Sequence, residues 1–130
     1  MGTSSGTANS ASSDASGGPG VLSEIHMAKD NGSGDPGDRA VVFSPGDRTI
    51  HCVAKLKEAK SGTGIKFSWW IVSAEGTQNE KIKDIDYTTK ALENIVHAHL
   101  KLPRDWPKGM YKVEIYVNGY LDKTAQYSVQ

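Results

Sequence analysis

The stretch Trp106-Pro-Lys-Gly-Met-Tyr-Lys-Val-Glu-Ile-Tyr-Val-Asn-Gly-Tyr-Leu-Asp-Lys-Thr-Ala-Gln-Tyr-Ser-Val129 decides the fold of this chain. Apolar and polar residues alternate from Tyr111 to Val117, which predicts a strand with one buried face. Asn118-Gly119 follows, and both residues tolerate a positive φ, so they predict a two-residue type I′ hairpin turn. The return strand is expected to bury Ala125, Tyr127 and Val129. Because a hairpin cannot bury its apolar face alone, the rest of the chain must supply an opposing sheet.

Composition limits the kinds of partner. The chain has 130 residues, with 15 basic and 15 acidic side chains, and this neutral balance gives no electrostatic case for nucleic acid or an anionic membrane. No apolar run approaches the roughly 18–20 residues of a membrane span, and no secretory apolar segment is present, so we expect that any signal or anchor has been removed or never existed. The single cysteine excludes an internal disulfide. We expect one monomeric domain whose stability comes from its core.

The amino-terminal end differs from the rest in composition. Residues 1–20 are mostly Gly, Ser, Thr, Ala and Asn, and such a segment has nothing to bury. It is interpreted as a flexible tether below a lipid anchor or between domains, or alternatively as a ragged terminus. Residues 21–130 form the predicted domain.

The remaining strands are predicted from the same alternation of apolar and polar residues. A short extended piece is expected at 40–43, and loops are expected at 30–38 and 75–80. The predicted strands are 21–29, 48–57, 65–73 and a weaker one at 81–87.

Residues 91–102 fit two patterns. Leu92, Ile95 and Leu100 contribute to a helical stripe, whereas Val96, Ala98 and Leu100 alternate as in a strand. We predict a strand, because the neighbouring segments are all β and Pro103 ends the run in an extended setting.

Taken in order, these residues resemble a known architecture. Cys52 and Trp69 lie on consecutive predicted strands, and Tyr111 begins a later one. Immunoglobulin domains place a core Trp near a disulfide, with a corner tyrosine two residues before the second cysteine. Here Val113 occupies the second cysteine position, so the resemblance implies a sandwich without the disulfide and a buried, inert thiol at Cys52.

Four segments carry a more particular resemblance, to bacterial immunoglobulin/fibronectin-III-like modules of exported proteins. These segments are Phe43–Ile50, Gly62–Trp69, Trp106–Val113 and Asn118–Gly119. The resemblance implies an all-β, antiparallel Greek-key sandwich of about seven strands in which Trp106 caps one end of the core. It further implies an extracytoplasmic module, in the periplasm or at the cell surface, with no catalytic residues and no cofactor. Such a module serves in adhesion, in spacing, or in binding another protein or a neighbouring domain.

Histidines are the first candidate site. In this fold the first, second, fourth and fifth strands share one sheet. The alternation then places His26, His51, His97 and His99 on one solvent-facing surface, within reach of a shared zinc, copper or nickel ion. No carboxylate is clearly placed beside them. A pH-responsive patch and four unconnected surface histidines are the alternatives.

Two aromatic residues form the second candidate. Trp70 and Tyr116 are expected to point outward from the other sheet, as in a surface that binds a protein partner or stacks on carbohydrate. A covering loop over Trp70 is the structural alternative. No nucleophile elbow, paired carboxylates or phosphate-binding loop can be recognised, so we expect no enzyme.

Overall fold

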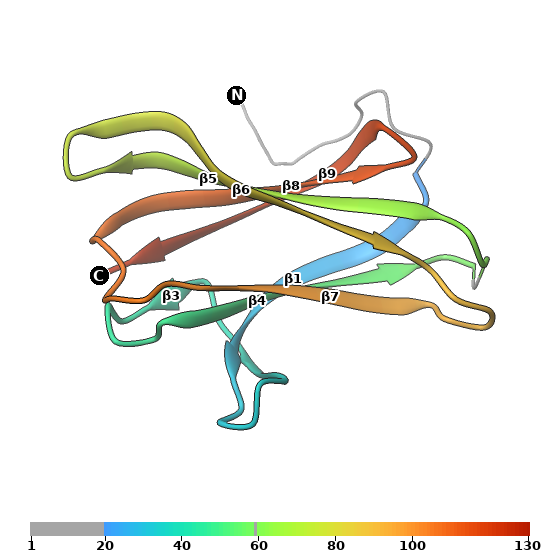
Figure 1. Ribbon diagram of the computed structural model, residues 1–130, viewed down its shortest axis with the longest axis horizontal. Helices are drawn as coiled ribbons and strands as arrows, with labels where there is room; N and C mark the ends of the chain where they lie inside the picture. Colours follow the sequence, from blue (N-terminus) through green and yellow to red (C-terminus); the bar gives the residue numbers. More distant parts are fainter. Residues whose placement is uncertain (1–19, 59) are drawn as a thin grey trace.

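The structure is a computed structural model that describes residues 20–58 and 60–130; nearly all of the predicted tether lies outside these residues. Figure 1 shows two facing layers of strands. Nine strands are present in the described part: β1 (Leu22–Asp30), β2 (Pro36–Arg39), β3 (Val42–Phe43), β4 (Thr49–Leu56), β5 (Gly64–Ala74), β6 (Thr77–Thr88), β7 (Ile95–Lys101), β8 (Gly109–Val117) and β9 (Tyr120–Val129). Within it there is no helix of the length and apolarity that a membrane span requires.

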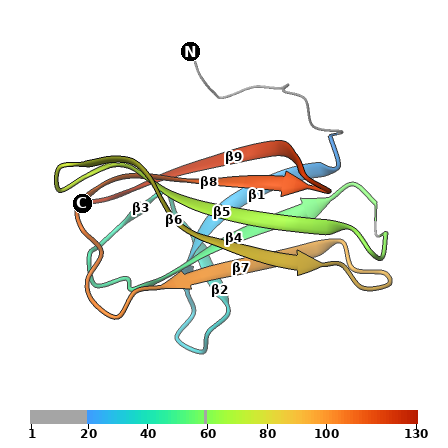
Figure 2. The ribbon, with the colours of Figure 1, turned by 45° about the horizontal axis from the view of Figure 1, so that its top comes forward.

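The strands form two sheets that enclose the core. One has the order β2-β1-β4-β7, and the other has the order β3-β9-β8-β5-β6. Figure 2 shows β9, β8, β5 and β6 following one another in the second sheet. Seven strands are long, and two short ones, β2 and β3, are added at sheet edges. The predicted antiparallel sandwich of about seven strands is therefore confirmed.

The closing hairpin has the predicted geometry. β8 and β9 are joined only by Asn118 and Gly119, whose φ angles are 49° and 88°. Tyr111, Val113 and Tyr127 are all buried. Two positive φ angles are the mark of a type I′ turn, so the tight reversal is confirmed.

Residues 91–102 contribute a strand and no helix. β7 pairs with β4 in antiparallel register, and its burial alternates along its whole length. Val96, Ala98 and Leu100 point into the core. The strand interpretation is confirmed for the residues of β7.

The weaker strand was placed in the wrong sheet. β6 pairs with β5, through a register that joins Ile65 to Tyr87 and Ala74 to Thr77. The expected loop at 75–80 shrinks to Glu75-Gly76, whose φ angles are 49° and 80°. These angles make a second tight hairpin turn, and a hairpin forces its two strands into one sheet. As a consequence, β7 is an edge strand.

Two further differences concern short strands. The segment at 30–38, expected as a loop, contains β2, which folds back on β1. The extended piece at 40–43 contains β3, which runs parallel to the last strand and pairs Phe43 with Val129. Both strands are held by backbone hydrogen bonds. Their segments are too short or too polar to show the alternation of apolar and polar residues from which a strand is predicted.

Candidate functional site

Three histidine side chains meet on the outer face of β4 and β7. His51 lies directly opposite His99, and His97 lies one row further along. The ring centre of His51 is 5.4 Å from that of His99 and 6.0 Å from that of His97. His97 and His99 are exposed, but His51 is 0% exposed, so the prediction of solvent-facing histidines is wrong at this residue. The reason is that neighbouring side chains, including one carboxylate, pack around its ring.

That carboxylate belongs to Asp30, which sequence analysis missed. Asp30 Oδ1 lies 2.7 Å from His51 Nε2, and Oδ2 accepts a hydrogen bond from the backbone N–H of Gly32 at 2.8 Å. The hydrogen bond with His51, followed by that from Gly32, lowers the pKa of Asp30. The first strand was expected to end at Lys29, whereas β1 continues to Asp30. This places Asp30 on the outer face, two residues after Ala28.

His26 shares this face but not the ring cluster. It lies opposite Val53, which separates it from His97. Burial lowers the pKa of His26, and the charge of Arg39 lowers it further. As the side chains stand, no group of three or more His, Cys, Asp or Glu residues in the described part of the chain is arranged to hold a metal ion. The four-histidine metal set stays a prediction, and the structure gathers three of its rings.

Trp70 and Tyr116 lie on the outer face of the other sheet, and both are half-buried. The ammonium groups of Lys81 and Lys112 lie 5.4 and 5.5 Å from the Trp70 ring centre. Lys66 lies 4.6 Å from the ring centre of Tyr116. These cation–π contacts place charged groups over the aromatic rings, whereas a loop over Trp70 was the alternative to an open surface.

The two rings lie on either side of one row of the sheet. Trp70 pairs with Lys112, and Tyr116 pairs with Lys66, while the row between them joins Ser68 to Glu114. Residues four apart on a strand are separated by roughly 13 Å along the backbone. However, Trp70 Nε1 donates to Ser68 Oγ at 3.0 Å and the Tyr116 hydroxyl donates to Glu114 Oε1 at 3.2 Å, so both side chains reach into this row.

One end of the sandwich, which we call the closed end, is filled by the aromatic rings of Trp106, Tyr111 and Tyr127. Tyr111 and Tyr127 stack at 5.3 Å, and Trp106 meets both rings edge-on. Trp106 Nε1 donates to the carbonyl of Arg48 at 2.9 Å. The Tyr111 hydroxyl donates to the carbonyl of Pro107, as in a tyrosine corner.

Trp69 and Cys52 lie in the core beside this cluster, and both are fully buried. Trp69 meets Tyr127 edge-on, with ring centres 6.3 Å apart. Burial raises the pKa of the Cys52 thiol, which keeps it protonated and unreactive. These positions make a packed core with no reactive group.

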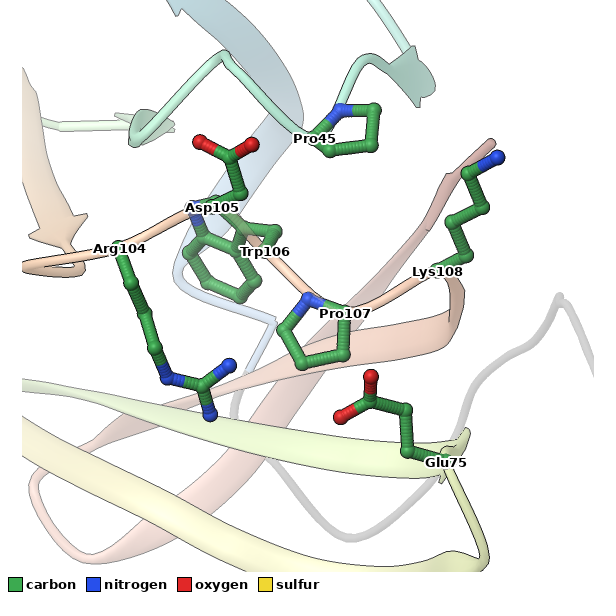
Figure 3. Close-up of a pocket in the computed structure, with 7 residues that line it drawn as sticks. All are labelled: Pro45, Glu75, Arg104, Asp105, Trp106, Pro107 and Lys108. Atoms are coloured by element: carbon green, nitrogen blue, oxygen red, sulfur yellow. The ribbon is translucent and has the colours of Figure 1, made fainter.

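A shallow pocket of about 590 Å³ opens above the closed end. Figure 3 shows Arg104 and Lys108 pointing to opposite sides of the Trp106–Pro107 segment, with the Glu75 carboxylate near Pro107. Asp105, also at the rim, pairs with Arg48 at 3.1 Å. Two cations and two carboxylates give the rim no net charge preference, so its chemistry selects no ligand class.

The opposite end, which we call the loop end, exposes large apolar side chains from the β6–β7 loop, the start of β7 and the β8–β9 hairpin. Leu92 is 88% exposed, Tyr120 is 63% exposed and Ile95 is 53% exposed. Leu92 also has a φ of 62°, a left-handed conformation that costs energy for any residue with a Cβ. Sequence analysis had placed Leu92 in a strand, so its exposure was not anticipated.

The loops at the loop end are fixed to one another. Gly62 in the β4–β5 loop donates its backbone N–H to the carbonyl of Thr89 at 2.8 Å, and Asn118 donates to that of Gly64 at 2.8 Å. Glu93 accepts hydrogen bonds from the Tyr87 hydroxyl, at 2.8 and 2.7 Å, and from a backbone N–H. Figures 1 and 2 both show these three connections at the same end of the sandwich.

Comparisons with known proteins support the fold. No protein-family model matches the chain, and no curated protein matches it in sequence. An immunoglobulin-like protein of Pseudomonas aeruginosa is similar in structure, with a TM-score of 0.54 and 9% identity over 85% of this chain and 94% of that chain. The alkylpurine DNA glycosylase AlkC of Pseudomonas fluorescens, bound to DNA containing an abasic site analog, has a TM-score of 0.49 and 14% identity over 85% of this chain and 30% of that chain. The first likeness shows an immunoglobulin-like sandwich, and the second adds nothing to it.

Proposed function

We propose that this chain is a non-enzymatic binding module that uses its loop end to contact another protein or a neighbouring domain. The observation that carries the proposal is the exposure of Leu92 in a left-handed backbone conformation. An apolar side chain at such a position gains nothing from the core and costs conformational energy. Residues of this kind persist where a function requires them.

The chemistry of the loop end fits a protein partner. Tyr120 can insert its ring into a partner while its hydroxyl makes a hydrogen bond, and tyrosine is enriched among residues that dominate binding energy. The hydrogen bonds that fix the three loops reduce the ordering entropy lost on association. Leu92 and Ile95 supply further apolar area at the same end of the sandwich.

The outer aromatic face offers less to a partner. Sugar stacking and apolar docking both need an open ring face, and at Trp70 and Tyr116 lysine ammonium groups lie over the rings. A ligand would have to displace these cation–π contacts first. This favours the loop end over a carbohydrate platform at Trp70 and Tyr116.

We further propose an extracytoplasmic location and a monomeric state, with lipid anchoring through a removed amino-terminal segment. The support is the resemblance of the turn and core motifs to bacterial modules of exported proteins. Fractionation of the source cells with an antibody to the domain tests the location, and a cytoplasmic signal would contradict it. Sedimentation of the purified chain tests the monomer.

Partner capture from an envelope extract of the source organism tests the binding surface. The bait variant combines Leu92→Asp with Tyr120→Ala, and the matched control combines Val41→Asp with Met110→Ala, two exposed apolar residues remote from the loop end. We expect the wild type and the control to recover the same protein, and the loop-end variant to lose it. Equal recovery by all three baits would overturn the assignment of this surface.

A further inference from the structure

The spacing between the His51 ring and its two histidine neighbours is close to that in a metal centre. Three nitrogen ligands arranged tetrahedrally at about 2.0–2.1 Å from a zinc ion have ring centres roughly 5 Å apart. The His51 ring centre lies 5.4 Å from that of His99 and 6.0 Å from that of His97. On the other side of His51 the neighbouring strand carries Ala28, and both residues are fully buried.

The hydrogen bond between His51 and Asp30 also suits a metal ligand. The carboxylate of Asp30 only accepts hydrogen bonds, so the proton that joins it to His51 lies on Nε2. In the neutral ring Nδ1 then carries the lone pair. This atom is buried and has no hydrogen-bond partner among the described residues. A carboxylate that holds one ring nitrogen while the other bears a free lone pair is the arrangement found around histidine ligands of metals.

We propose that His51, His97 and His99 bind one transition-metal dication per chain, of the class of Zn²⁺, Ni²⁺ or Cu²⁺, with Asp30 as the supporting carboxylate. Imidazole nitrogen suits these ions, and a bound water completes four-coordination around zinc. The site is assembled by the ion, because the exposed rings of His97 and His99 must rotate toward His51 Nδ1. This accounts for the three ligands not being in coordinating positions as the side chains stand.

Titration of the full chain with ZnCl₂ tests the proposal. Binding is measured by calorimetry and by long-range ¹H–¹⁵N spectra of the imidazole nitrogens. We expect a saturable heat with one ion per chain. The Nδ1 resonance of His51 shifts, while its Nε2–H to Asp30 is retained. NiCl₂ and CuCl₂ serve as comparison ions, and CaCl₂, which prefers oxygen ligands, gives no response.

Substitutions in and around the ring cluster separate this site from general surface binding. His97→Ala and His99→Ala each weaken zinc binding roughly tenfold or more, and Asp30→Asn weakens it about ten- to a hundredfold. His26→Ala is the matched control, because His26 lies on the same face but outside the ring cluster, beside Arg39. It leaves the affinity unchanged. Circular dichroism of each variant confirms that it is folded.

Two outcomes overturn the proposal. One is the absence of a saturable response to all three ions at millimolar concentration. The other is a loss of affinity in His26→Ala as large as in His99→Ala, which would indicate scattered surface histidines. Neither outcome bears on partner binding by the loop end, since Leu92 and Tyr120 are not part of the ring cluster.

Discussion

The two ends of the sandwich use aromatic and apolar side chains in opposite ways. At the closed end, Trp106, Tyr111 and Tyr127 are buried against one another. At the loop end, Leu92 and Tyr120 project into solvent from loops that are themselves well fixed. The difference separates the residues that stabilise the fold from those free to act on a partner. Substitutions at the closed end should therefore change the free energy of unfolding, and substitutions at the loop end should change binding.

The largest effect is expected at Trp106. Trp106→Ala removes a fully buried ring and its hydrogen bond to the Arg48 carbonyl, so it should cost about 3–5 kcal/mol of unfolding free energy. Urea denaturation followed by circular dichroism measures this. Trp70→Ala is the control, because its half-buried ring should cost clearly less. Equal losses in the two variants would mean that Trp106 does not close the core.

A smaller effect distinguishes the two stacked tyrosines. Tyr111→Phe leaves the Pro107 carbonyl without its donor and should cost about 1–2 kcal/mol. Tyr127→Phe should be neutral or stabilising, because the Tyr127 hydroxyl is buried with no hydrogen-bond partner in the described part of the chain. Denaturation of both variants under the same conditions tests the contrast. A larger loss in Tyr127→Phe would show that its hydroxyl is in fact satisfied.

At the loop end we expect stability and binding to diverge. Leu92→Gly relieves the strain of the left-handed backbone conformation, but it also raises the conformational entropy of the unfolded chain. The free energy of unfolding should therefore stay unchanged or rise by at most about 1 kcal/mol. The same variant should recover less partner in the capture experiment. Leu92→Asn, which also tolerates a positive φ, provides a second folded variant. A clear destabilisation by both would assign Leu92 to the fold.

The smallest effect is a pH dependence at the loop end. The hydrogen bond from the Tyr87 hydroxyl, and then that from the backbone of Lys90, lower the pKa of Glu93 below 4.5. A carboxyl whose folded pKa is depressed contributes stability above its unfolded pKa and loses it as the pH falls through the folded value. The stability difference between wild type and Glu93→Gln should thus be present at pH 6 and should shrink below about pH 4.5. A difference that does not change with pH would rule out this linkage.

Much of the fold follows from local sequence patterns, and the departures have physical causes. The period-two alternation located the β8–β9 hairpin and the strand at β7, because one buried face imposes that period. The partner of β6 was mistaken, because its turn is Glu75-Gly76, and glutamate is a weaker turn signal than the asparagine of Asn118-Gly119. Pairing is a property of two segments together, and the alternation in one does not reveal it.

The candidate sites were less predictable for the same reason. Face assignment brought His51, His97 and His99 together, since a strand has only two faces. It could not show that His51 is buried or that Asp30 holds it, because those facts depend on a strand one residue longer than expected. The exposure of Leu92 depends on a loop conformation that has no periodic signature.

The parallel pairing of β3 with β9 has a mechanical consequence. The carboxyl-terminal strand is bound on its outer side by hydrogen bonds from Ser128 to the Val41 carbonyl at 2.9 Å and from Gln130 to the Phe43 carbonyl at 3.0 Å. Because β3 and β9 are parallel, the chain enters β3 at one end of the pair and leaves β9 at the other end. A force that pulls on these two chain segments therefore loads both hydrogen bonds together in shear, and does not break them one at a time. A domain held under tension between neighbouring domains would resist extension at this pair of strands.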